Sequence, residues 1–589
     1  MRYIGTHMHL HSCYEVLGSM HGHCAQAKKY GLEALWFTDH DTFMGARRAC
    51  NGYDFESGLL HSTPNKGVAE KLRKWTKLMA ELGENIDQDL WRRALEKATP
   101  LPSYTGFITN QEECVTWDDS DAFTGTHCMC MEVAGQTSVW KTVSAEFVAW
   151  KKRMNRPLIA GVTLGLAFRL DQPLGNNGRV LIEFAFSHQP PNWDVSKLIY
   201  CAGLAEGLEA PGTVVLPFEL EGNGIWQYVF LPLSADAEYH VPGQLDNAFQ
   251  NMTIRIEARN GKQFALRVDQ LCIWETYHLQ ELMLRQRSIG RKIGREYGVN
   301  VFVTTEVSMA GHHKNCFSEH VPIMDYPAAE YHITHEEAVV HLHKHNAVFA
   351  FNHPYIEYIH LPLTQVQREK VVRHETQVLI RERCYGAPLL EVAFPEGRYG
   401  FELSDYLKLW DDLSLHGVYV TGYGDSDNHR CDERWADGNN FAAYIAAEEA
   451  DCDSLCKGMC AGDLYSADPA ESVRLESFTL AEHPDVHMGS IVLTQPGQVD
   501  VRIRLTGCTD DMELRWIDHG NVSQIEHLAT GKAVYTHGCM FGGERGLCRV
   551  EVYRRSDNRC LLISNPIYFA VNEPQAHPQR PIVWLSNGQ

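Results

Sequence analysis

The feature that most constrains this chain is a repeated pattern: a short apolar run that ends in histidine or a carboxylate. The first instance is residues 3–11, YIGTHMHLH, and the second is residues 34–40, ALWFTDH. In an extended strand alternate side chains share a face, so we expect His7, His9 and His11 to point the same way. A single stretch of this kind is more often a polar strand face than a metal site.

Recurrence of the pattern favours a metal site over a polar face. The later instances are VNVFVTTEV (299–307) with Glu306, AVFAFNHP (347–354) with His353, and GVYVTGYGDSDNHR (417–430) with Asp425, Asp427 and His429. Helical segments and one further apolar run, 388–394, alternate with these strands, which predicts a parallel sheet. In parallel barrels the reactive groups lie at the carboxyl ends of several strands, so these ligands should converge. Imidazole beside carboxylate suits zinc, manganese or iron.

The region between the two parts of this pattern is rich in strands. We predict strands at 179–186, 212–220, 225–233, 252–259 and 264–274. Gly, Pro, Asn and Asp separate them, which is typical of a β-sandwich. We interpret the region as a jelly-roll-like insertion, an architecture that often binds sugars. Exposed Trp or Tyr would give it a binding surface, although aromatic residues in a sandwich are more often core.

Alternating strands return after residue 470 and predict a second sandwich. The predicted organisation is a discontinuous catalytic body (1–130 and 276–470), an inserted β-sandwich (131–275), a C-terminal β-sandwich (471–573) and a loosely held tail (574–589). Helices are expected at 68–83, 86–99, 335–345 and 402–415, the third with a capping box of Thr334 and Glu337. Cys452, Cys456 and Cys460 are interpreted as helix packing, since no tight CxxC pair accompanies them.

Composition excludes several classes of partner. The 53 basic against 75 acidic residues give a net charge of -22, which argues against nucleic acid and anionic membranes. No apolar run approaches the roughly 20 residues of a membrane span. The N-terminus has no secretory pattern, so we expect a cytoplasmic protein whose 18 cysteines are mostly reduced.

The motifs HMHLHS, TDHD, TTEVSMAGHH, FNHP and GDSDNHR, in this order, resemble those of the PHP (polymerase and histidinol phosphatase) superfamily of metal-dependent hydrolases. The similarity is greatest to its CehA/McbA-like group, and RVEVYR (549–554) and SNPIY (564–568) resemble that group's C-terminal sandwich. The resemblance covers roughly residues 1–45 and 280–570 and implies an α/β fold, a distorted seven-stranded (β/α) barrel with two or three divalent metal ions.

The resemblance also implies roles for individual residues. The implied metal ligands are His9, His11, His40, Glu306, His312, His353, Asp427 and His429, with Glu306 bridging two ions. His7 and Asp39 would support ligands from behind, and Arg430 and His313 would contact an anionic substrate.

The sequence offers fewer ligands for a third metal ion. Val16 stands where the family commonly has a carboxylate or histidine ligand, so Glu15, or else His21 or His23, would have to replace it. Adjacent residues point apart in an extended backbone, so Glu15 needs a local rearrangement.

The function implied is hydrolysis by a metal-bound hydroxide, since two divalent ions lower the pKa of water toward about 7. A phosphoester is the expected substrate, and a carboxyl or carbamate ester on the same site is the alternative. The substrate would be a small-molecule or glycan-linked ester. A different class of function also stays open, in which the sandwiches bind glycan and the barrel is a scaffold. Because imidazole ligands must be neutral, activity should fall below about pH 6.

Overall fold

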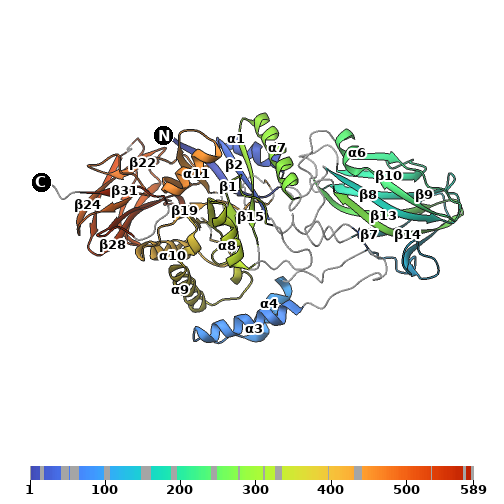
Figure 1. Ribbon diagram of the computed structural model, residues 1–589, viewed down its shortest axis with the longest axis horizontal. Coiled ribbons are helices and arrows are strands. Elements are labelled where there is room, and N and C mark those ends of the chain that lie inside the picture. The colour runs from blue at the N-terminus through green and yellow to red at the C-terminus, as the bar shows by residue number, and fades with distance from the viewer. Residues whose placement is uncertain are drawn as a thin grey trace.

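The computed structural model describes residues 2–12, 19–40, 52–53, 66–98, 107–147, 161–186, 196–240, 248–275, 279–308, 312–324, 334–394, 397–429, 431, 441–531, 534–574 and 579–585. Three parts lie in a row along its longest axis (Figure 1). The C-terminal strands lie at one end, the inserted strands at the other, and the strands that carry the histidine and carboxylate motifs lie between them.

The motif-bearing strands form one half of a long mixed sheet. Their order is β19 (Thr421–Gly424), β18 (Leu389–Ala393), β17 (Phe349–Phe351), β16 (Lys314–Cys316), β15 (Asn300–Val307), β2 (Ala34–His40) and β1 (Arg2–Leu10). Neighbours in this order are parallel except at β16, which runs antiparallel to both β15 and β17. The strands are almost wholly buried, as parallel strands covered on both faces are.

The two ends of this strand order meet. Leu10 forms an isolated parallel bridge with Asn428, and the His11 amide donates to the Asn428 carbonyl at 3.1 Å. The segment after β19 therefore lies beside the end of β1. No closed barrel is found among the described strands, so the seven-stranded barrel stays a prediction.

Helices cover this half of the sheet. Those close to the motif strands are α1 (Met20–Tyr30), α7 (Leu279–Tyr297), α8 (His335–Lys344), α9 (Gln365–Arg381), α10 (Leu403–Leu415) and α11 (Cys452–Ala461). The capping box of Thr334 and Glu337 is confirmed. The sequence analysis did not predict α1, which Ser19 caps and Gly31 ends in a left-handed conformation. None of the described helices is both long and apolar enough to cross a bilayer.

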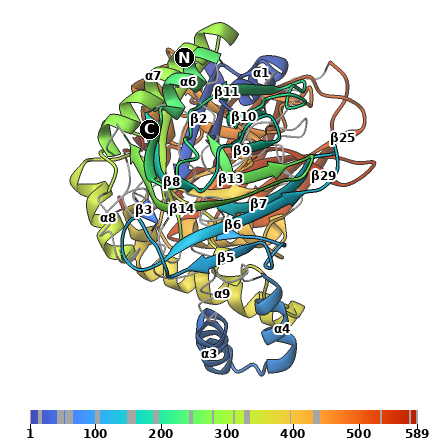
Figure 2. The same ribbon diagram turned by 90° about the vertical axis from the view of Figure 1, so that its right-hand side faces the viewer.

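A further helix pair packs beside α9 (Figure 2). It consists of α3 (Lys66–Glu81) and α4 (Gln88–Ala98), close to the predicted bounds. Lys370 on α9 donates to the Leu82 carbonyl at 2.9 Å, and Trp75 and Trp91 are buried in the core cluster that includes α9 and α10. The pair thus belongs with the motif-bearing part of the molecule.

The inserted region consists of two facing sheets with a core between them. One contains β11 (Thr213–Pro217), β10 (Lys197–Gly203), β9 (Gly178–Phe186), β13 (Phe249–Ala258), β7 (Lys141–Phe147) and β4 (Phe107–Ile108). The other contains β12 (Trp226–Leu231), β8 (Val162–Leu170), β14 (Lys262–Glu275), β6 (Cys128–Gly135), β5 (Val115–Asp118) and, beside β14, β3 (Gly52–Tyr53). A short helix, α6 (Leu233–His240), follows β12. The predicted start at residue 131 is too late, because β4 and β5 pair within these sheets.

The C-terminal part continues the long sheet. From β1 the order runs through β20 (Ala442–Ala447), β21 (Leu464–Ala467), β29 (Arg559–Ser564), β28 (Arg545–Arg554), β30 (Ile567–Ala570), β23 (Ile491–Leu493) and β31 (Ile582–Trp584), with β25 (Met512–Asp518) beside β28 and β26 (Asn521–His527) beside β25. A three-stranded sheet of β22 (Arg474–Leu480), β24 (Gly497–Thr506) and β27 (Val534–Phe541) forms the second layer.

Residues 579–585 near the chain end are bound to the C-terminal strands rather than loosely held. Strand β31 pairs with β23, and Arg580 is buried and donates to Thr421 Oγ1 at 2.7 Å and to the Gly489 carbonyl at 3.1 Å. The expectation of a loose tail is therefore wrong for residues 579–585, since a buried guanidinium and a strand hold them.

Candidate metal centre

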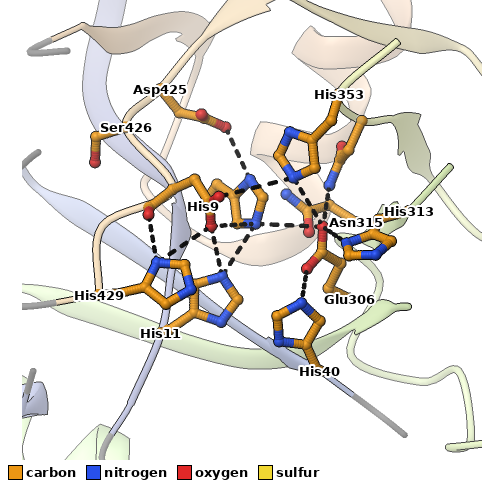
Figure 3. A network of polar contacts seen from close by, with 12 residues as sticks. His9, His11, His40, Glu306, His313, Asn315, His353, Asp425, Ser426 and His429 are labelled. Atoms are coloured by element: carbon orange, nitrogen blue, oxygen red, sulfur yellow. Dashed lines mark hydrogen bonds and ion pairs between the residues drawn. The ribbon is translucent and has the colours of Figure 1, made fainter. Parts of the chain in front are cut away.

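Histidine and carboxylate side chains from distant parts of the chain converge at the ends of β1, β2, β15, β17 and β19 (Figure 3). Overlapping groups of three have donor atoms within 4.8 Å of one another: His9–His353–Asp427, His9–His11–Glu306, His11–Asp427–His429 and His40–Glu306–His313. Parallel strands end at a common edge, and this geometry brings the groups together.

Glu306 occupies the middle of the centre. Its Oε1 lies 3.1 Å from His313 Nδ1, 3.2 Å from His353 Nε2 and 3.5 Å from His9 Nε2. Its Oε2 lies 2.9 Å from His40 Nε2. Burial would raise the pKa of this carboxyl, but the surrounding histidines hold it well below its usual range. One ionised carboxylate thus faces imidazoles with both of its oxygens, three at Oε1 and one at Oε2.

Asp427 is a second carboxylate shared between groups. Its Oδ1 lies 2.7 Å from His11 Nε2 and 3.2 Å from His9 Nε2. The backbone at both Asp427 and His353 is left-handed, with φ of 47° and 46°. Non-glycine residues in this region cost free energy and gather at functional sites, where the fold holds a side chain in place.

The donor set fits divalent metal ions. His9 Nε2 and His11 Nε2 face each other at 3.3 Å, a contact that needs a proton or a cation between the two nitrogens. Burial lowers the pKa of His9, but the charges of Glu306 and Asp425 outweigh it and raise that pKa to about 10. Burial and His9 lower the pKa of His11 to about 4. A divalent ion between these donors would satisfy the two nitrogens that face each other.

Glu391 supports the centre, and the sequence analysis did not select it. It lies on β18, fully buried, with Oε1 3.2 Å from His9 Nδ1. Its Oε2 contacts His353 Nδ1 and accepts a 2.7 Å bond from the His353 amide. A carboxylate on Nδ1 fixes the imidazole so that Nε2 faces the centre. The signal for it was a charged residue within the apolar run PLLEVAF, because buried Glu is rare unless paired.

Arg398 is a second residue that sequence reasoning missed. Its guanidinium contacts Asp427 Oδ2 and lies 3.7 Å from Glu391 Oε1. Its side chain is 18% exposed, so this charge borders the open side of the centre. Nothing in the local sequence around residue 398 indicated this position.

Two residues predicted to support the ligands do lie behind them. His7 Nε2 contacts Ser426 Oγ at 2.7 Å, and burial lowers the pKa of His7 to about 3. Asp39 accepts from the Ser12 amide at 2.6 Å and from the Ser12 hydroxyl at 2.7 Å. Asp39 therefore anchors the backbone that follows His11.

Of the adjacent histidines 312 and 313, His313 and not the expected His312 faces the centre. His313 faces Glu306, whereas His312 packs on Phe351 with ring centroids 4.8 Å apart and points to Glu375, 3.9 Å away. Adjacent side chains on an extended segment point opposite ways, and the sequence did not show which of the two faces inward. We therefore replace His312 by His313 among the expected ligands.

The side of the centre formed by histidines is open. Side-chain exposure is 38% for His429, 19% for His313 and 15% for His40, against 0–1% for His9, His11 and Glu306. The centre thus has a buried base, and His429, His313 and His40 are its more exposed side chains.

Four further candidates were named from the sequence. Glu15 and Arg430 fall outside the described residues. His21 Nδ1 contacts Tyr297 at 3.4 Å, and His23 packs on Phe37 with ring centroids 5.5 Å apart. Neither is a member of the ligand groups around Glu306 and Asp427.

Comparisons with known proteins add little. No family model and no curated protein matches the chain. Among solved structures, a family 30 carbohydrate-binding module of a Clostridium thermocellum cellulase is similar at 13% identity over 29% of this chain and 92% of that chain, with a TM-score of 0.18. The glycoside hydrolase domain of Endo-D from Streptococcus pneumoniae R6 is similar at 6% identity over 80% of this chain and 38% of that chain, with a TM-score of 0.17. Similarity this low supports no argument about the fold or the function.

Proposed function

We propose that this chain is a metal-dependent hydrolase that cleaves an ester bond, with a phosphoester as the first choice. The observation that carries the proposal is Glu306, whose Oε1 faces three imidazoles at 3.1–3.5 Å and whose Oε2 faces the fourth, His40, at 2.9 Å. A carboxylate whose two oxygens face different imidazoles is the arrangement expected of a binuclear hydrolytic centre. The predicted PHP-type ligand pattern is consistent with it after His313 replaces His312.

The residues that would hold divalent zinc, manganese or iron are those of the overlapping groups around Glu306 and Asp427. Ions bound there would lower the pKa of water at the site and offset the negative charge that develops in the transition state. The chain's own residues fix the geometry, since Glu391 orients His9 and His353 through their Nδ1 atoms.

Arg398 favours an anionic substrate. Burial opposes its charge, but the neighbouring acidic groups raise its pKa, so the guanidinium stays cationic beside the open side of the centre. Arginine matches the oxygens of a phosphate group with paired donors. This charge favours a phosphoester over a neutral carboxyl or carbamate ester, which is the alternative on the same centre.

The test is Glu306→Ala in the full-length protein, with metal content and hydrolysis of generic phosphomonoester, phosphodiester and carboxyl ester substrates measured after addition of manganese or zinc. We expect the wild type to turn over a phosphoester and the variant to lose both activity and bound metal. A variant with full metal occupancy would contradict the bridging role. A wild type that binds metal but cleaves none of the substrates would contradict the hydrolase itself.

A second candidate function, glycan binding, rests on the outer face of the β12–β8–β14 sheet. Phe230 is 62% and Trp274 45% exposed, and their rings stack at 5.5 Å. Tyr228 joins them, 5.0 Å from Phe230. Gly165 beneath makes this possible, because a Cβ there would lie 2.6 Å from both Trp274 and the Tyr228 hydroxyl. Exposed flat rings stack on the apolar faces of sugars.

Affinity electrophoresis through gels that contain soluble hydroxyethylcellulose or xyloglucan tests this second function. We expect retardation of the wild type and its loss in Phe230→Ala/Trp274→Ala. Glu306→Ala is the matched control, since it changes only the centre and should be retarded like the wild type. Equal mobility of all three proteins on both glycans would remove the reason for this function.

A further inference from the structure

A second cluster of metal-binding side chains lies far along the chain from the centre, between the two layers of the C-terminal part. Cys539 is on β27 of the three-stranded sheet, and Cys548 and Asp518 are opposite each other on β28 and β25 of the long sheet. Their donor atoms lie within 4.8 Å of one another. Three potential ligands from three strands thus meet across the layers.

All three occupy positions that normally hold core residues. Along β27 the buried residues alternate, and Cys539 is one of them with 0% exposure. Cys548 is also 0% exposed, and the side chain of Asp518 is only 13% exposed. An aspartate at an inward position of a sandwich is costly unless its charge is compensated.

The compensation of Asp518 is incomplete. His537 Nε2 lies 2.8 Å from Asp518 Oδ2, while Oδ1 is buried without a hydrogen-bond partner among the described residues. Asp518 belongs to a group whose donor atoms include both thiols.

The Cys548 thiol lies opposite the Asp518 carboxylate on the neighbouring strand. A bound cation would suit this arrangement, since a coordinating thiol loses its proton outright.

We propose that Cys539, Cys548 and Asp518 bind a thiophilic divalent cation such as Zn²⁺. Thiolate sulfur with one carboxylate is a donor set that selects zinc over magnesium or calcium. A bound ion would cross-link the two layers, because the ligands lie on strands of both sheets. His537 holds Asp518 from the other side and so acts as a positioning residue.

The probe is Cd²⁺, which absorbs in the ultraviolet when thiolates bind it. Reduced full-length protein, stripped of metal with a chelator, is titrated with Cd²⁺. The ligands named for the main centre are imidazoles and carboxylates, so this absorption would not come from them. We expect a band that saturates at one Cd²⁺ per chain and is lost in Cys539→Ser/Cys548→Ser.

A second cysteine pair in the same protein provides the control. Cys452 and Cys456 lie one turn apart on α11, and Cys452→Ser/Cys456→Ser should keep the band. Asp518→Asn should weaken Cd²⁺ binding by about tenfold or more. If the double cysteine variant fails to fold, the wild type and Asp518→Asn still decide the question.

Three outcomes would overturn the proposal. The reduced wild type could show no thiolate band, or the band could persist in Cys539→Ser/Cys548→Ser. The third is a Cys539–Cys548 disulfide, found by mass spectrometry of metal-free peptides from freshly purified protein, which would make the pair a covalent cross-link instead.

Discussion

The centre and the inserted sandwich are both built on largely buried strands, but their polar residues lie in different places. In the sandwich the two faces of a strand differ, as in β7, where buried residues alternate with partly exposed ones. In β1, β2 and β15 nearly every residue is buried. A strand covered on both faces has room for polar groups chiefly where they pair with one another near its end.

This difference separates two kinds of function. The centre needs histidines and carboxylates from at least five strands to meet, so each substitution there should change chemistry. The sandwich face needs only neighbouring strands of one sheet, so substitutions there should change binding of a surface ligand. The predictions below test whether the two regions are independent in this sense.

The largest effect is expected from Asp427→Asn, which removes the charge of the second shared carboxylate. We expect hydrolysis to fall roughly 10²–10³-fold, the range found when one stabilising group of a reaction centre is removed. The inserted sandwich should stay folded, as shown by unchanged limited proteolysis and far-ultraviolet circular dichroism. Proteolytic loss of the sandwich in this variant would show that the two regions are coupled.

The neighbouring histidines allow a matched comparison within the centre. His313→Ala should lower metal content and cut the rate about 10- to 100-fold, since His313 faces Glu306 at 3.1 Å. His312→Ala removes a ring of the same kind one residue away and should leave both within about twofold of the wild type. The reverse result would restore the assignment expected from the sequence.

Glu391→Gln keeps the shape of the side chain that orients His9 and His353 but removes its charge. Supporting carboxylates of this kind typically contribute 10- to 100-fold in metal affinity. We expect a loss in the lower half of that range, with a smaller change in kcat at saturating metal. Equilibrium dialysis with Zn²⁺ or Mn²⁺ measures it, and unchanged affinity would mean that Glu391 only fills space.

The last prediction concerns the dependence of metal affinity on pH. With a pKa raised to about 10, His9 holds a proton at pH 7 in the metal-free protein, and a metal ion at Nε2 must displace it. His11 and His40, whose pKa values burial lowers to about 4 and about 3, are already neutral. Metal affinity should therefore rise about tenfold per pH unit between pH 6 and 9.

Calorimetry in buffers of different ionisation enthalpy measures how many protons the protein releases when it binds the metal ion. We expect release of close to one proton per chain at pH 7 for the first metal bound. No release would show that the carboxylates do not hold His9 in its charged form. Because these histidines stay neutral well below pH 6, a fall in activity near pH 6 would have to come from groups other than His11 and His40.

Much of the fold could be predicted from the sequence, because periodicity reports burial directly. The helix at 402–415 is observed at Leu403–Leu415, and the strand at 299–307 at Asn300–Val307. The sequence did not predict which strands pair with one another. Strands β4 and β5 belong to the inserted sheets, and β31 pairs with β23 at the chain end. A strand of only a few residues is too short for its hydrophobic pattern to indicate which strand it pairs with.

For the centre, the sequence by itself determined which residue types end which strands, because a buried strand accommodates a histidine or carboxylate only where it finds partners. This pattern indicated the strand ends that carry histidine or carboxylate, and the resemblance to the PHP superfamily implied which of them are ligands, namely His9, His11, His40, Glu306, His312, His353, Asp427 and His429. Only the tertiary structure decided that His313 and not His312 faces inward, and that Glu391 and Arg398 complete the surroundings. The reason is physical: strand periodicity fixes the face of a residue within a strand, but at turns and between distant strands the direction of a side chain depends on packing.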